Sequence, residues 1–84
     1  MNPVRFRMNR ELRKRSLLQI VEAAGRAITV SEIAEYAGLK RTPYLVELLD
    51  ELETEGSLDW SLAVLPGGWV GRIYYPRGGY QRDS

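Results

Sequence analysis

Neither cysteine nor histidine occurs in the sequence. Their absence excludes disulfide bonds, thiolate nucleophiles, imidazole bases and the usual zinc ligands. A metal site would have to be built from carboxylates alone, so we expect no metal, no other cofactor and no enzymatic activity. No apolar run approaches the roughly 18 residues that span a bilayer, and the arginine-rich N-terminus lacks the apolar stretch of a secretory signal. These absences favour a cytoplasmic, or nucleoid-associated, protein that does not contact a membrane.

The 84 residues, 44% hydrophobic and 27% charged, are typical of one soluble globular domain. Their net charge of +1 conceals two segments of opposite charge. Residues 1–15 contain six basic residues and one acidic residue, a net charge of +5. Residues 47–59 contain six acidic residues and no basic one, a net charge of −6. Because a nucleic-acid footprint is a local patch of positive charge, this distribution is more informative than the sum.

The first helix is expected to span about residues 10–24, with Asn9 as its N-cap and Gly25 at its end. Four apolar residues at spacings of three and four form its buried stripe: Leu17, Ile20, Val21 and Ala24. Basic residues continue this stripe toward the N-terminus, so the first turns should overhang the core. Residues 1–9 show no helical stripe and are predicted to form a basic arm.

Two further helices are joined by a tight turn. Thr29 and Glu32 form a T-x-x-E capping box ahead of a helix over about residues 30–37. Gly38 suits the left-handed position past its end. The pair Thr42-Pro43 opens the third helix as N-cap and first helical residue. The apolar positions of the third helix predict its buried face: Leu45, Leu48, Leu49 and Leu52.

Beyond Gly56, which should end the third helix, the apolar period changes to two. This pattern predicts strands over about residues 58–64 and 69–75, joined by the turn Pro66-Gly67-Gly68. Residues 77–84 are polar and glycine-rich and are predicted to form a flexible tail. Four aromatic residues of the strands are expected mostly to pack in the core rather than stack on bases: Trp60, Trp69, Tyr74 and Tyr75.

The chain resembles the winged helix-turn-helix superfamily, specifically the DNA-binding domains of prokaryotic transcriptional regulators. The residues that carry the resemblance are T-V-S-E-I-A-x-x-A-G-L in the second helix and its turn, and T-P-Y-L-x-x-L-L-x-x-L-x-x-x-G in the third helix. It implies an α+β fold of three helices followed by a two-stranded β-hairpin wing over residues 10–76. The basic arm (1–9) and the flexible tail (77–84) would flank this domain.

In this superfamily the start of the third helix enters the major groove of double-stranded DNA. The resemblance therefore implies DNA contacts from Lys40, Arg41, Thr42 and Tyr44. Two cations beside a helix N-terminus also reinforce an anion site, and arginine can pair with guanine O6 and N7. Alternatively, the two cations only keep the turn soluble.

Further DNA contacts are expected outside the third helix. Cations near the N-terminus are placed to contact phosphates or enter a minor groove, unless that segment is merely solubilising: Arg5, Arg7, Arg10, Arg13 and Lys14. In the wing, Arg72 would contact the DNA backbone. The sequence thus favours a DNA-binding protein, interpreted as a transcriptional regulator.

The acidic half of the third helix opposes this interpretation, because unpaired carboxylates repel phosphates. Glu47 and Asp50 lie opposite the leucine stripe, and they would suit a basic protein partner. An adaptor or complex subunit with a winged-helix fold is therefore the alternative. A homodimer on a two-fold DNA site is also plausible, with Met8, Leu12 and the wing as the candidate contacts.

Overall fold

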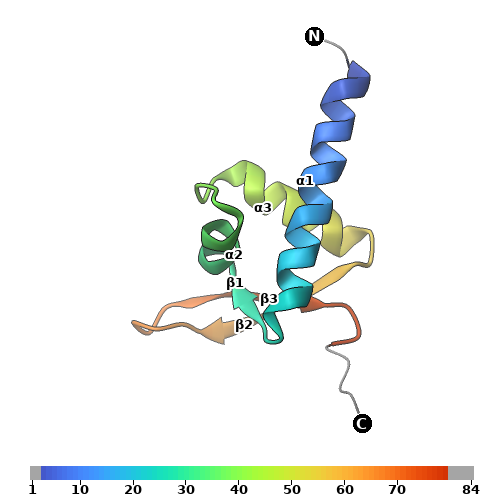
Figure 1. Ribbon diagram of the computed structural model, residues 1–84. Coiled ribbons are helices and arrows are strands. Elements are labelled where there is room, and N and C mark those ends of the chain that lie inside the picture. The colour runs from blue at the N-terminus through green and yellow to red at the C-terminus, as the bar shows by residue number, and fades with distance from the viewer. Residues whose placement is uncertain (1–2, 80–84) are drawn as a thin grey trace.

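A computed structural model describes the backbone of residues 3–79 and the side chains of residues 9–79 (Figure 1). Three helices pack against an antiparallel sheet of three strands in the order β1-β3-β2. The elements follow the chain as α1 (Pro3–Ala24), β1 (Ile28–Thr29), α2 (Val30–Ala37), α3 (Pro43–Thr54), β2 (Leu58–Val64) and β3 (Val70–Pro76). The α+β class, the three helices and the hairpin are confirmed. Within the described residues, no helix is long and apolar enough to cross a membrane.

The first helix is longer than predicted. It begins at Pro3, so the expected start at Arg10 with Asn9 as N-cap is wrong, and residues 3–9 are helical. Proline suits the first position of a helix, and Arg, Met and Glu are good helix formers. A stripe of apolar residues marks the part of a helix that packs on the core, not the whole length of the helix. The first turns of α1 project beyond the body of the molecule, so they carry no such stripe (Figure 1). The expected contacts of Arg5 and Arg7 lie outside the described side chains.

A third strand, β1, has no signal of its own in the sequence. It consists of Ile28 and Thr29, which pair with Tyr74 and Ile73 of β3. Two residues are too few to show an alternating pattern, and Thr29 also carries the N-cap signal of α2. The short strand fixes the start of α2 against the sheet, so it positions the two helices that follow.

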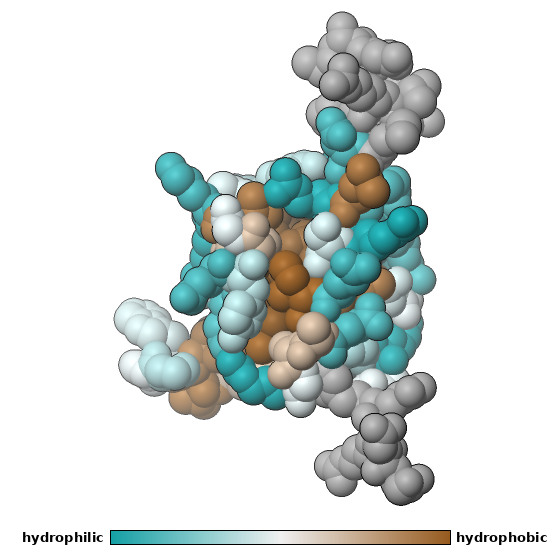
Figure 2. All heavy atoms as spheres, in the orientation of Figure 1, coloured by the Kyte–Doolittle hydropathy of each residue, from teal (hydrophilic) through white to brown (hydrophobic). Residues whose placement is uncertain are grey.

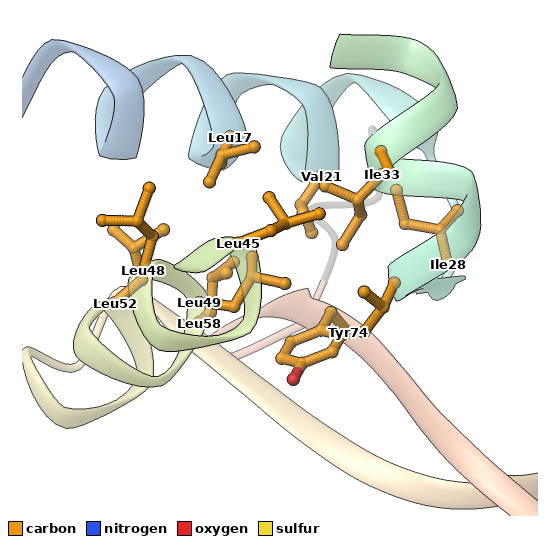
Figure 3. Close-up of a cluster of buried hydrophobic side chains, with 12 residues drawn as sticks. Leu17, Val21, Ile28, Ile33, Leu45, Leu48, Leu49, Leu52, Leu58 and Tyr74 are labelled. Carbon is orange, nitrogen blue, oxygen red and sulfur yellow. The ribbon is translucent and has the colours of Figure 1, made fainter. Parts of the chain in front are cut away.

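The core lies between the helices and the sheet, where side chains of α1 and α2 point toward α3 and β3 (Figure 3). The predicted leucine face of α3 is buried, as are Leu17 and Val21 of α1. Burial of an apolar side chain of this size stabilises the fold by about 1.5–3 kcal/mol. The buried apolar side chains are Leu17, Val21, Ile28, Val30, Ile33, Ala34, Leu45, Leu48, Leu49, Leu52, Leu58 and Tyr74.

The predicted helix caps are confirmed. The Thr29 hydroxyl accepts a hydrogen bond from the Glu32 N–H, and the Glu32 carboxylate accepts one from the Thr29 N–H. The Thr42 hydroxyl accepts from the Leu45 N–H at 3.3 Å, with Pro43 at the first helical position. These caps set where α2 and α3 begin, which fixes the turn between them.

Gly38 ends α2 in the left-handed conformation, with φ +68° and ψ 29°. Nothing lies within 4 Å of the Cβ that a substitution would add, so the cost of Gly38→Ala is conformational only. We expect a loss of about 1 kcal/mol, seen as a fall in Tm of about 4–8 °C. Gly38→Asn should lose less because asparagine tolerates this region. Equal Tm values for wild type and Gly38→Ala in a thermal unfolding experiment would contradict this account.

The hairpin of β2 and β3 pairs over its whole length, from Leu58 opposite Pro76 to Val64 opposite Val70. Its base lies under the helices, and its turn extends past them to one side (Figure 1). Of the four aromatic residues expected mostly in the core, Tyr74 is fully buried and Trp60 and Tyr75 are half-buried. Trp69, 75% exposed, is the exception to the expected packing. Its position next to the turn carries it beyond the helices.

The first residue after β3, Arg77, is still hydrogen-bonded to the folded domain. The Arg77 N–H donates to the Ser57 carbonyl at 3.2 Å, and the Arg77 guanidinium donates to the Glu53 carbonyl at 3.3 Å. Residues 80–84 of the predicted flexible tail lie outside the described residues.

Candidate functional site

The acidic face of α3 is paired with cations from α1. Arg10 bonds the carboxylates of Glu51 and, at 3.3 Å, Glu47, and its guanidinium lies 5.5 Å from the centre of the Tyr44 ring. The hydrogen bond to Glu51 raises the pKa of Arg10 above its ordinary value. Arg10, an expected DNA contact, is shared here between two carboxylates of α3.

Lys14 lies one turn further along α1 and is the only charged side chain buried among the described residues, at 3% exposure. Its ammonium bonds the carboxylate of Glu55 and lies 3.4 Å from that of Glu11. The hydrogen bond to Glu55 raises the pKa of Lys14, so the side chain stays charged at neutral pH. Lys14 was an expected DNA contact, but burial leaves almost none of it accessible.

Arg72 on β3 supports α3 from the other side. Its guanidinium donates to Asp50 at 3.0 Å and to the Tyr74 hydroxyl at 3.4 Å, and it stacks 4.2 Å from the centre of the Trp60 ring. The hydrogen bond to Tyr74 raises the pKa of Arg72. The expected backbone contact of Arg72 with DNA would compete with three intramolecular contacts.

These pairs explain the segregated charge of the sequence. Glu47 and Asp50 expose 63% and 53% of their side chains, yet each lies next to a cation of the same chain. Opposite charges at these distances largely cancel in the field that a phosphate backbone would meet. The objection that α3 presents unpaired carboxylates to DNA is therefore weakened, fully at Asp50, which is paired with Arg72, and partly at Glu47, which shares Arg10 with Glu51.

The start of α3 is the place where cations remain exposed. Lys40 and Arg41 lie in the turn before the helix, and no ion pair involving either is found among the described residues. Arg41 donates to the Ser31 hydroxyl of α2 at 3.3 Å, which orients its guanidinium. Tyr44, 44% exposed, follows on the first turn. Thr42 is occupied as the N-cap, as its position implied.

A pocket of about 170 Å³ brings Arg13 of α1 to the same place. Arg13 and Lys40 are 27 positions apart in sequence, and their proximity could not be read from it. The pocket opens beside the N-terminus of α3, where the helix dipole favours an anion. Its lining residues are Arg13, Leu39, Lys40, Thr42, Tyr44, Leu45 and Leu48.

A second hollow, of about 800 Å³, lies between α1 and α2 and was not anticipated. Leu12 and Tyr36 stand exposed at its sides, with Ile20 and Ala23 between them. Apolar surface is visible there in the space-filling view (Figure 2). The only sign of this hollow in the sequence was that Leu12 is an apolar residue outside the predicted buried stripe of the first helix.

Within the described residues, no group of three or more Asp, Glu, His or Cys side chains could hold a metal ion. No protein-family model matches the chain, and no curated protein matches it in sequence. The site is therefore defined by its geometry: a capped helix start, three exposed cations and an aromatic ring, beside a helix on which Glu47, Asp50 and Glu51 are paired.

The capping box of α2 gives a pH-dependent contribution to stability. The Arg26 guanidinium, and then the Thr29 N–H, lower the pKa of Glu32. A lowered pKa in the folded state stabilises the protein above the ordinary glutamate pKa of about 4.3, and this contribution is lost as the pH falls through the folded value.

Glu32→Gln should retain the capping box and lose the ion pair with Arg26. We expect the wild type to be the more stable protein at neutral pH, and the difference to shrink as the pH falls from about 6 to about 3. Urea unfolding of both proteins across this range measures the difference. A difference independent of pH would contradict the assignment.

Proposed function

We propose that the protein binds double-stranded DNA through the start of α3, as a transcriptional regulator of the winged-helix type. The carrying observation is that Arg13 and Lys40 line one pocket beside this helix start and exposed Arg41 follows Lys40 in the chain, while Glu47 and Asp50 are paired with cations of the same chain. Phosphate contacts supply most of the affinity of a protein for DNA, and a helix N-terminus with adjacent cations is suited to them.

We propose two kinds of DNA contact. Arg41, oriented by Ser31, is the candidate for reading a guanine edge in the major groove. Lys40 and Arg13 are candidates for phosphates on either side, and Tyr44 for a phosphate or a thymine methyl group. The hairpin contributes no cation other than the occupied Arg72, so we place the binding energy on the helices.

The alternative, an adaptor that binds a basic partner through Glu47 and Asp50, loses support. Both carboxylates would have to leave Arg10 and Arg72 before they could pair with a partner. Exchange of one ion pair for another at a solvent-exposed site gains little free energy.

The test is fluorescence anisotropy of a labelled duplex of about 25 base pairs, titrated with protein at several salt concentrations. Micromolar binding whose logarithm falls linearly with the logarithm of the salt concentration is expected. Lys40→Ala/Arg41→Ala should weaken binding by about tenfold or more and make the slope shallower by about one to two units.

The matched control is Arg15→Ala/Arg26→Ala, which removes the same two charges from exposed positions outside the site. This control should retain the wild-type dependence of the logarithm of affinity on the logarithm of the salt concentration. Absence of binding by the wild type at low salt, or equal losses in the two double variants, would overturn the proposal. Circular dichroism establishes that both variants are folded.

A further inference from the structure

Strand β2 presents an unprotected edge. Because β3 lies between β1 and β2, no described strand pairs with the outer edge of β2. Proteins usually protect such an edge with lysine, proline, a bulge or a covering segment. Residues 60–71, which include most of the hairpin, contain no charged residue, and the only proline there is in the turn. The backbone groups along this edge are free to pair with another strand.

Apolar side chains accompany the free edge. Leu62, Val64 and Val70 are 65%, 75% and 67% exposed, and strand alternation places them on the sheet face that carries the buried Leu58 and Tyr74. Apart from Arg72, which lies opposite Leu62 and stacks on the Trp60 ring, this face is apolar from base to turn, but the helices cover only its base. Where the hairpin extends past them, it is exposed beside α2 (Figures 1 and 2).

We propose that two copies of the chain associate through antiparallel pairing of their β2 strands about a two-fold axis. Such an axis places one residue opposite its own copy, and directly opposite residues point to the same face. With Leu62 on the axis, Val64 of each copy lies opposite Trp60 of the other. The exposed apolar residues of both copies then meet on one face of a continuous sheet of six strands.

A second copy suits this surface for two reasons. Asp59 at the base is the only charged residue of β2, and the uncharged part of the strand, residues 60–64, is best matched by another uncharged strand such as its own copy. Leu62, Val64 and Val70 together present on the order of 300 Å², the lower end of the range of about 300–600 Å² for the largest apolar patch of a monomer, which is often functional.

The proposal goes beyond DNA binding and is tested without DNA, so the two can fail separately. Sedimentation velocity of the wild type between about 5 and 500 µM should show a monomer–dimer equilibrium with a micromolar Kd, as befits an interface of modest area. Val64→Lys should abolish the dimer over this range. The matched control is Ala23→Lys, which charges the hollow between α1 and α2 and should dimerise like the wild type.

Because the chain has no cysteine, a single introduced thiol reports the register. Directly opposite Cβ atoms in an antiparallel pair lie about 4.5–5.5 Å apart, close to disulfide geometry. Leu62→Cys should form a disulfide-linked dimer at least about tenfold faster than Ala23→Cys under mild oxidation. Equal rates of disulfide formation in the two variants would contradict the register in which Leu62 lies on the two-fold axis.

A wild type that stays monomeric throughout, or a Val64→Lys variant that still dimerises, would overturn the proposal. Loss of the dimer in Ala23→Lys alone would place the interface in the hollow between α1 and α2. If Val64→Lys dimerises normally but loses DNA affinity, the hairpin contacts DNA as an apolar wedge instead.

Discussion

Leu49→Ala is expected to lower the free energy of unfolding by about 2–5 kcal/mol. Leu49 is fully buried on α3, among side chains from the other helices and the sheet (Figure 3). The truncation removes apolar contacts and leaves a cavity that rigid neighbours cannot fill. Because a domain of this size is stable by only about 5–10 kcal/mol, the loss should bring the variant close to its unfolding midpoint at moderate temperature.

Urea unfolding followed by circular dichroism measures this loss. Leu12→Ala is the matched control, because it removes the same atoms from a side chain that is 55% exposed. Its expected effect is within about 0.5 kcal/mol. If the two substitutions had similar effects, Leu49 would not be part of a close-packed core.

Lys14→Glu is expected to destabilise the protein by about 2–3 kcal/mol. It places a carboxylate at a buried position between Glu11 and Glu55, where the wild type has a compensating ammonium. Breaking a fully buried pair costs about 3–5 kcal/mol, and the expected value is lower because both glutamates are about half-exposed or more and solvent screens them.

Two further variants separate charge from packing at Lys14. Glu55→Lys in the Lys14→Glu background restores an opposite pair and should recover much of the lost stability. Lys14→Met keeps the buried stem and should be nearly neutral, since apolar replacement of a buried ion is often tolerated. It should also bind DNA within about twofold of the wild type, whereas a direct phosphate contact would cost more and make the salt slope shallower by about one unit.

The raised pKa of Lys14 fixes the pH dependence of this contribution. A group whose pKa is higher in the folded state stabilises the protein below its ordinary pKa, about 10.4 for lysine, and the contribution is lost as the pH rises through the folded value. Lys14 therefore keeps the positive charge that the ion pair needs throughout the physiological pH range. Only strongly alkaline solution should lower the stability of the wild type relative to Lys14→Met.

Local signals in the sequence determined most of the secondary structure. The hydroxyls of Thr29 and Thr42, the ring of Pro43 and the missing side chain of Gly38 act on backbone groups within four residues, so their effects can be read along the chain. The leucine spacing of α3 likewise follows from the helical period alone. The start of α1 was misplaced because an overhanging helix has no buried stripe.

Only the tertiary structure decided what the charges do. The sequence contains a basic and an acidic segment more than thirty residues apart, and either could have faced a partner. Packing of α1 against α3 sets Arg10 and Lys14 on Glu47, Glu51 and Glu55, and β3 sets Arg72 on Asp50. Ion pairing depends on distances of a few ångströms between elements, which sequence spacing does not specify.

Tertiary structure also decided the exposure of two surfaces, the apolar face of the hairpin and the cations at the start of α3. Alternation in the hairpin predicted its strands, but their exposure depends on where the helices stop covering the sheet. The gathering of Arg13 with Lys40 depends on how α1 crosses the start of α3. The sequence by itself determined the elements, their caps and the apolar faces, because those are short-range. The tertiary structure alone decided which cations and which apolar residues remain available, because availability is what packing leaves uncovered.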